Sequence, residues 1–187
     1  LALLVSSFIC GLAMIAAKRK NMLWTQVFLL LTGLFGLVFL ALEITVDSLA
    51  VAAVGLGGET LDESRVDRRR DRLSVDETIA DLVALAKPLL RRLPDRDSLI
   101  GIGVAVVGIV RRADGFVTMA PNLGWRDVPF GERLADALDT TLPIVVANEA
   151  DLGALAEWRR GSAVGADHVL FVSGEVGVGG GLIVDGK

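Results

Sequence analysis

The sequence has few of the residues that build disulfides and metal sites. It contains one cysteine, Cys10, and one histidine, His168, among its 187 residues. A single cysteine excludes an intrachain disulfide and a cysteine-based metal cluster within these residues. A single histidine excludes a histidine pair as metal ligands, and we interpret His168 as an ordinary residue at the edge of a strand.

The chain also lacks an excess of positive charge. Its net charge is −4 and its pI is near 5.0, so no global attraction draws it to nucleic acid. The most highly charged stretch, residues 62–97, includes three consecutive arginines at 68–70, but its nine acidic residues balance nine basic ones. This balance favours a solvated loop and helix face over a nucleic-acid-binding patch.

Apolar residues are abundant, and their excess lies in the first 42 positions. They make up 52% of the chain, and the mean hydropathy is +0.57. Residues 1–17 and 22–42 form two apolar runs around a polar segment at 18–21, and each run approaches the ~20 residues that cross a bilayer. We therefore predict a transmembrane helical hairpin over residues 1–41, with membrane association as its consequence. A buried pair of core helices and a segment joined from another reading frame are the alternatives.

From residue 42 onward, short β-rich runs alternate with helical periodicity, which is typical of a soluble α/β domain. Ser74 and Glu77 form a capping-box pattern that predicts the start of a helix, and apolar residues continue on one stripe as far as Leu90. Further helices are predicted around residues 130–138 and over 150–160. A hairpin is predicted over 109–119, and strands are predicted at 42–46, 50–56, 59–66, 99–107, 143–147, 168–173 and 178–184.

This order of elements matches one lobe of the actin-like, ribonuclease-H-like fold. Residues 42–148 are predicted to form that lobe, and residues 149–187 are predicted to begin a second one. The chain starts with Leu1 rather than Met and stops at Lys187 after a strand and turn. We therefore expect a fragment that is truncated within the second lobe.

Short amide and carboxylate side chains stand where predicted strands end. Asn122 follows Pro121 in a loop after a strand, and Asn148 and Glu149 end the strand at 144–147. Because each hexose hydroxyl both donates and accepts hydrogen bonds, a sugar site needs such side chains on rigid turns. The alternative is that Asn122 caps a turn and Asn148 caps the following helix.

Several segments resemble, in order and spacing, proteins of the ROK family (repressors, open reading frames, kinases). They are residues 100–110, 114–117, 120–125 and 143–157, together with the glycine-rich run at 174–181. The resemblance implies that Asn122, Asn148 and Glu149 bind sugar hydroxyls. It also implies that Gly108 lets the backbone approach the sugar.

The phosphate-binding features of ROK kinases are altered. These kinases carry a D-x-G-G-T pattern between the first two strands, whereas residues 43–48 have no glycine and begin with Glu43. The resemblance also implies a catalytic base after Asn148, but Glu149 stands where kinases have Asp, and a displacement of about 1 Å can cost on the order of a hundredfold in rate. Gly174, Gly177 and Gly179 would hold ATP phosphates only if ATP binds. Glu175 stands among them where kinases have a small neutral residue.

These features predict a sugar-responsive ROK transcriptional regulator whose cleft binds a monosaccharide or its phosphate. The alternatives are an ATP-dependent kinase for hexoses or N-acetylhexosamines, with Glu149 as the base, and a membrane-tethered sugar sensor. The resemblance implies a cytoplasmic domain, a homo-oligomer in the complete protein, and DNA contact through a helix-turn-helix module that this sequence does not contain. It also implies a zinc cluster beyond Lys187. Trp125 and Trp158 are interpreted as packing residues rather than sugar-stacking ones.

Overall fold

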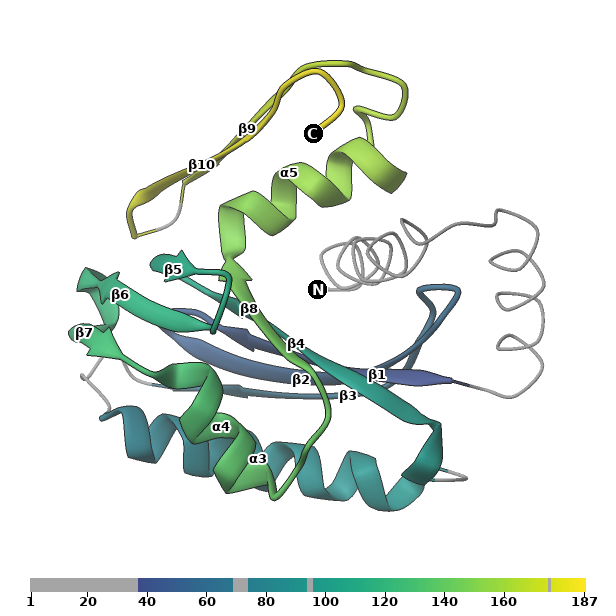
Figure 1. Cartoon of the computed structure of the whole chain (residues 1–187), viewed down its shortest axis with the longest axis vertical. Coiled ribbons are helices and arrows are strands. Elements are labelled where there is room, and N and C mark those ends of the chain that lie inside the picture. Colours follow the sequence, from purple (N-terminus) through teal and green to yellow (C-terminus); the bar gives the residue numbers. More distant parts are fainter. Residues whose placement is uncertain (1–36, 69–73, 94–95, 175) are drawn as a thin grey trace.

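The centre of the fold is a mixed five-stranded sheet (Figure 1). In the computed structural model, which describes residues 37–68, 74–93, 96–174 and 176–187, its strands lie in the order β3 (Thr60–Asp67), β2 (Ser48–Gly55), β1 (Val38–Ile44), β4 (Leu99–Val106) and β8 (Ile144–Asn148). β1, β2 and β3 are antiparallel neighbours, whereas β4 and β8 run parallel to β1. The carboxyl ends of β1, β4 and β8 therefore meet at one edge, where open α/β sheets bind their ligands.

The first strand begins earlier than the sequence pattern predicted. β1 covers Val38–Ile44 rather than 42–46, and all seven of its residues are buried. The predicted membrane hairpin over residues 1–41 is therefore wrong at its end, because residues 38–41 pair with β2 and β4. A central strand that is buried on both faces is continuously apolar, so hydropathy alone does not distinguish it from a membrane helix.

The remainder of that predicted hairpin, residues 1–36, lies outside the described residues. Within the part of the chain that the structure describes, no helix is both long enough and apolar enough to span a bilayer.

Helices α3 (Val75–Arg92) and α4 (Phe130–Leu138) cover one face of the sheet (Figure 1). The predicted capping box is confirmed: Ser74 N donates to Glu77 Oε2 at 2.8 Å, and Glu77 N donates to Ser74 Oγ at 3.2 Å. The apolar stripe of α3 belongs to the main core, where α3 packs on β2 and β3 of the sheet. α3 continues through Pro88 to its end at Arg92.

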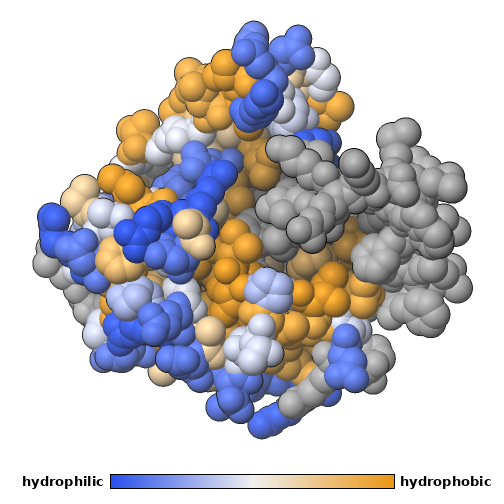
Figure 2. All heavy atoms as spheres, in the orientation of Figure 1, coloured by the Kyte–Doolittle hydropathy of each residue, from blue (hydrophilic) through white to orange (hydrophobic). Residues whose placement is uncertain are grey.

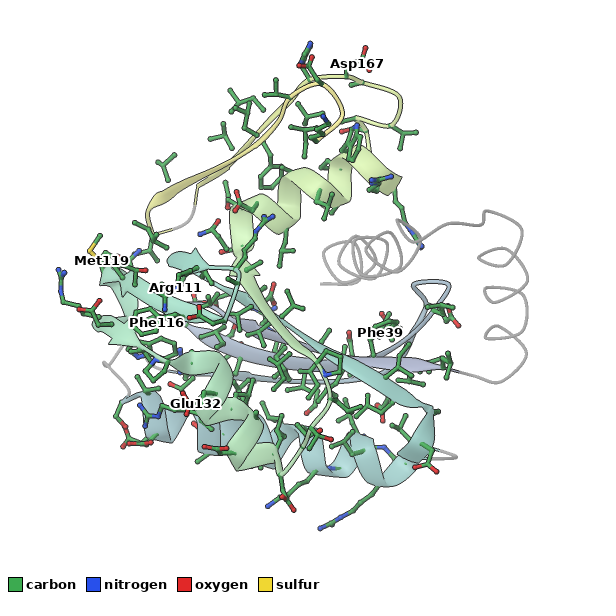
Figure 3. All side chains as sticks on the ribbon, viewed as in Figure 1. Phe39, Arg111, Phe116, Met119, Glu132 and Asp167 are labelled. Carbon is green, nitrogen blue, oxygen red and sulfur yellow. The ribbon has the colours of Figure 1, made fainter. Side chains whose placement is uncertain are left out.

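The predicted hairpin over 109–119 is confirmed, and a third strand extends it. β5 (Ile109–Arg111) and β6 (Phe116–Ala120) pair with each other, and β7 (Trp125–Val128) pairs with β6. The Arg111 guanidinium lies 4.5 Å from the centre of the Phe116 ring, and Figure 3 shows both side chains on this hairpin. Arg111 also bonds to the Asp114 carboxylate at 2.6 Å, and this bond holds the pKa of Asp114 below its ordinary value.

The last helix, α5 (Glu149–Arg160), leads into a hairpin of β9 (Val169–Gly174) and β10 (Val178–Ile183). α5 packs closely on the hairpin, since a Cβ at Gly181 would lie only 2.3 Å from the Ala150 carbonyl oxygen. The other side of the hairpin is apolar and open to solvent, and Figure 2 shows apolar side chains at this end of the molecule. Its most exposed side chains, between 61% and 85% accessible, are Leu170, Val172, Val178 and Leu182. The predicted α/β class is confirmed, and the central sheet is found to be mixed.

Candidate functional site

A cavity of about 310 Å³ opens beside the carboxyl ends of β1, β4 and β8. Six of the residues predicted from the sequence line it: Gly108, Asn122, Asn148, Glu149, Gly177 and Gly179. Gly174 does not line it. The structure thus brings both halves of the predicted site together, and their roles in binding remain predictions.

Asn148 is held by three hydrogen bonds at the wall of this cavity. It ends β8, and its Oδ1 accepts hydrogen bonds from Ala150 N at 2.8 Å and Asp151 N at 3.3 Å at the start of α5. Its Nδ2 donates to the Gly108 carbonyl oxygen at 2.7 Å. The capping role that we considered as the alternative is therefore present. An amide NH₂ group has two hydrogens, and Gly108 accepts one of them.

Gly108 is required by packing inside the protein. A Cβ at this position would lie 2.8 Å from the Met119 carbonyl oxygen and 2.8 Å from Ala120 Cβ, which is closer than real Cβ contacts. The glycine therefore lets the chain after β4 pass against the end of β6. This close passage places the Gly108 carbonyl oxygen where Asn148 Nδ2 donates to it. Gly108 therefore helps to position the Asn148 side chain.

Asn122 also lines the cavity. It belongs to the short 3₁₀ helix Pro121–Leu123, where it is exposed and makes no hydrogen bond with any residue that the structure describes. A Cβ on Gly177 would lie 3.4 Å from Asn122 Nδ2, so the turn between β9 and β10 comes into contact distance of this amide. The Pro121–Leu123 helix and the β9–β10 turn thus approach each other at the cavity, where the Asn122 amide is available to a ligand.

Glu149 and Asp151 give the first turn of α5 two carboxylates. Glu149 is half-buried and lines the cavity, whereas Asp151 forms an ion pair with Arg112 at 3.2 Å. Carboxylates at a helix N-terminus interact favourably with the helix dipole. The first turn of α5 therefore supplies its own favourable carboxylates, of which Asp151 is paired with Arg112 and Glu149 borders the cavity.

The turn between β1 and β2 is closed by its own polar groups. Thr45 N donates to the Ser48 carbonyl oxygen at 3.0 Å, Ser48 N donates to Thr45 Oγ1 at 3.1 Å, and the two hydroxyl oxygens lie 2.8 Å apart. Val46 lies between Thr45 and Ser48 in the sequence, and it lines the cavity. This turn therefore presents an aliphatic residue to the cavity.

Two arginines hold the same turn in place. Arg65 belongs to β3, and Arg68 directly follows that strand. Arg68 donates to the Thr45 carbonyl oxygen at 3.0 Å and to Thr78 Oγ1 at 3.1 Å, and Arg65 donates to Ser48 Oγ at 2.9 Å. Burial lowers the pKa of Arg68, an effect opposed by Asp81 and Asp47. The turn is thus tied to α3 and β3 as well as to itself.

Sequence patterns did not identify the aliphatic and hydroxyl residues of the cavity. Besides Val46, these are Val107, Ile109, Ser173, Val176 and Val178. Valines in a cavity look the same in sequence as valines in a core. Ser173 offered one signal, because it precedes the glycine-rich run at the end of a predicted strand.

The remaining candidates have structural roles. Trp125 is buried and stacks on Phe130 with 5.4 Å between ring centres, and Trp158 Nε1 donates to the Ala166 carbonyl oxygen at 2.7 Å, so the predicted packing roles are confirmed. His168 is exposed, and its Nδ1 accepts from Asp185 N at 3.3 Å. Within the described ranges, no group of three or more His, Cys, Asp or Glu side chains is arranged to hold a metal ion.

Residues 39–187 match the model of the ROK family. A glucokinase from Halalkalibacterium halodurans is 31% identical over 151 residues, which cover 80% of this chain and 44% of that protein. A xylose repressor from Caldicellulosiruptor bescii is 27% identical over 150 residues, which cover 79% of this chain and 37% of that protein.

Solved structures agree with this relationship. The structure of a ROK family transcriptional regulator, a homologue of the MLC protein of E. coli, superposes with a TM-score of 0.70 and 27% identity. It matches 81% of this chain and 38% of that regulator. The chain therefore spans less than half the length of each of these relatives.

Proposed function

Because the chain belongs to the ROK family, we propose that it is part of a sugar-responsive transcriptional regulator rather than of a sugar kinase. The family contains both kinds of protein among the relatives of this chain, a xylose repressor and a glucokinase. The self-closed turn between β1 and β2 is the observation that favours the regulator.

Sugar binding is supported by the polar groups around the cavity. Asn122 and Asn148 offer amide groups, Glu149 offers a carboxylate and Ser173 offers a hydroxyl. Such groups match a ring of hydroxyls that both donate and accept. The volume of about 310 Å³ lies at the lower end of the range of about 300–1,000 Å³ for small-molecule sites, which suits a monosaccharide.

Phosphoryl transfer is disfavoured by the turn between β1 and β2. A phosphate-binding turn needs free backbone N–H groups and a close approach of the backbone. Here the N–H groups of Thr45 and Ser48 bond within the turn, and the Val46 side chain stands at the cavity wall. Glu43, which leads the turn from within β1, adds a buried carboxylate. We infer that ATP phosphates are not held at this position.

A ligand in this cavity would connect two parts of the protein. Asn148 ends β8 of the five-stranded sheet and Asn122 lies between β6 and β7 of the three-stranded sheet, whereas Ser173 and Gly177 belong to the β9–β10 hairpin. A sugar that contacts both would favour the arrangement in which they lie together, and a shift in that population is how an effector acts on an attached module. In the complete protein, we propose that this module binds DNA.

The second candidate is a sugar kinase, and the glucokinase relative is the observation that favours it. Glu149 is then the base, and Gly177 and Gly179 remain from the second phosphate turn. The two functions differ in one measurable property, which is sugar-dependent release of ADP from ATP.

The test uses the full-length product of the gene, incubated with ATP, Mg²⁺ and a panel of pentoses, hexoses and N-acetylhexosamines. We expect at least one sugar to raise the melting temperature, with no sugar-dependent ADP release in a coupled assay. Sugar-dependent ADP release would overturn the regulator and support the kinase. A panel without any binding sugar would overturn both.

A further inference from the structure

An ion pair joins two segments that border the cavity without itself bordering it. Arg112 Nη2 lies 3.2 Å from Asp151 Oδ2, and neither residue is among the described residues that line the cavity. Arg112 directly follows β5, whereas Asp151 belongs to the first turn of α5. Figure 1 shows β5 beside the junction of β8 and α5. The pair therefore bridges two elements just outside the site.

The same two segments meet a second time at the cavity wall, where Asn148 Nδ2 donates to the Gly108 carbonyl oxygen at 2.7 Å. Residues 107–109 of one segment and residues 148–150 of the other all line the cavity. A single hydrogen bond leaves two segments free to pivot about it, whereas a second contact a few residues further along both segments removes that freedom. The ion pair thus acts on the angle between two walls of the cavity.

The turn that carries Arg112 is fixed to the rest of the fold. A Cβ at Gly115, in this turn, would lie 2.8 Å from Val146 Cγ2 of β8, so the turn packs closely on the central sheet. Gly131 N of α4 also donates to the Gly115 carbonyl oxygen at 3.2 Å. Arg112 therefore extends from a fixed base, and its ion pair holds the start of α5 against that base.

Asp151 is connected in turn to groups that line the cavity. Its backbone N–H donates to Asn148 Oδ1 at 3.3 Å while its side chain pairs with Arg112. Its neighbour Ala150 packs on the β9–β10 hairpin, since a Cβ at Gly179 would lie 3.0 Å from Ala150 Cβ. Gly179 also lines the cavity. A displacement of Asp151 would therefore shift both the Asn148 amide and the hairpin wall.

We infer that Arg112 and Asp151 are positioning residues, whose ion pair sets how the start of α5 meets the β5–β6 hairpin and thereby how the Asn148 amide meets a ligand. This inference rests on the proposed sugar-binding function. The two side chains are 63% and 42% exposed, and an exposed pair contributes a modest energy that salt screens. Its loss should weaken sugar binding about two- to fivefold. Salt should therefore weaken the binding even of a sugar that carries no charge.

The experiment measures dissociation constants of the full-length protein for xylose, glucose and N-acetylglucosamine by calorimetric titration, at about 0.05 M and about 0.5 M sodium chloride. In the parent protein, binding should be about two- to fivefold weaker at the higher salt concentration. Arg112→Gln and Asp151→Asn should each show this loss already at low salt and should no longer respond to salt. The double variant should bind no more weakly than either single one, because both remove the same interaction. Arg112→Lys, which keeps the charge, should restore salt-dependent binding.

Arg92→Gln is the matched control. Arg92 pairs with Asp62 at 2.6 Å between α3 and β3, and these side chains are 57% and 34% exposed, so the variant removes a similar pair from another place. It should change neither the affinity for sugar nor its salt dependence. Parent-like affinity in Arg112→Gln, losses that add in the double variant, a salt response that persists there, or an equal loss in Arg92→Gln would each overturn the inference and leave the proposed function standing. If the parent protein binds none of these sugars, the proposed function is wrong and this inference falls with it.

Discussion

The β1–β2 turn and the β8–α5 junction both lie at the carboxyl end of a parallel strand, and both line the same cavity. In the first, hydroxyls and backbone groups bond to one another and leave Val46 at the wall. In the second, the Asn148 amide holds the helix and Gly108 while it borders the cavity. The two junctions thus differ, since the first presents an aliphatic residue to the cavity and the second presents an amide that we propose binds a ligand.

The largest expected effect comes from Asn148→Ala, which removes the amide at the β8–α5 junction. The variant loses the α5 cap and the bond to Gly108, which should lower the free energy of unfolding by about 1–2 kcal/mol. It should also weaken sugar binding tenfold or more, since a stranded ligand hydroxyl costs about 1–3 kcal/mol. Chemical denaturation and calorimetric titration measure the two losses.

Asn148→Ser separates these two losses. Serine is a good N-cap and should recover most of the stability, but it lacks the amide that reaches Gly108. If Asn148→Ser binds sugar like the parent protein, the amide is not a sugar ligand and the site assignment is wrong.

The next largest effect is expected from Arg68→Ala, which tests what holds the β1–β2 turn in place. Without Arg68, the Thr45 carbonyl and the fully buried Thr78 hydroxyl lose a partner, which should cost about 1–3 kcal/mol of unfolding free energy. Arg91→Ala, at an exposed position of α3, is the control and should change stability by less than about 0.5 kcal/mol. Equal denaturation midpoints for the two variants would show that the turn does not depend on Arg68.

A smaller effect is expected from Val46→Gly, which gives the turn a glycine like that of kinases. The added chain entropy should cost about 0.5–1 kcal/mol, and the loss of an aliphatic wall should weaken sugar binding a few fold. Because the Thr45 and Ser48 N–H groups stay bonded, no ATP turnover should appear. Sugar-dependent ADP release by this variant would mean that Val46 alone blocks the phosphate.

The smallest effect concerns the other capped helix, α3, whose N-terminus lies outside the cavity. Hydrogen bonds from Ser74 lower the pKa of Glu77, so its contribution to stability is complete above the ordinary pKa of 4.5 and is lost as the pH falls through the lowered value. In Glu77→Gln this part of the acid sensitivity should disappear, and sugar binding should not change. Denaturation curves between neutral and acidic pH provide the measurement, and identical acid profiles would contradict it.

Local signals in the sequence predicted much of this fold. The capping box at Ser74 and the hairpin turn at Asp114 and Gly115 depend on neighbouring residues, so each is readable from a few positions. β7 was missed because it has four residues and includes Asp127 at φ 53°, which breaks the pattern of an extended strand. The start of β1 was missed because burial on both faces hides the alternation of a strand.

The candidate site was predictable where its residues are polar and stand at strand ends. Asn122, Asn148 and Glu149 were identified in this way, and the structure places them around one cavity. The reason for Gly108 was not predictable, because its neighbour at Ala120 is brought there by the hairpin. Nor was the role of Val46, since only the folded turn determines which way an aliphatic side chain lies.

The solvent-exposed apolar side of the β9–β10 hairpin has a consequence for local stability. A two-stranded sheet has little stability of its own, and this one is held by α5 along one side only within the described structure. In a protein of these 187 residues, its amide hydrogens should therefore exchange with solvent sooner than those of the five-stranded sheet, because a two-stranded sheet packed on one helix opens at a lower free energy. A sugar that touches Ser173 and Gly177 stabilises the closed hairpin by mass action. Ligand binding in the cavity would then slow amide hydrogen exchange throughout the hairpin, although the ligand contacts the hairpin only near its turn.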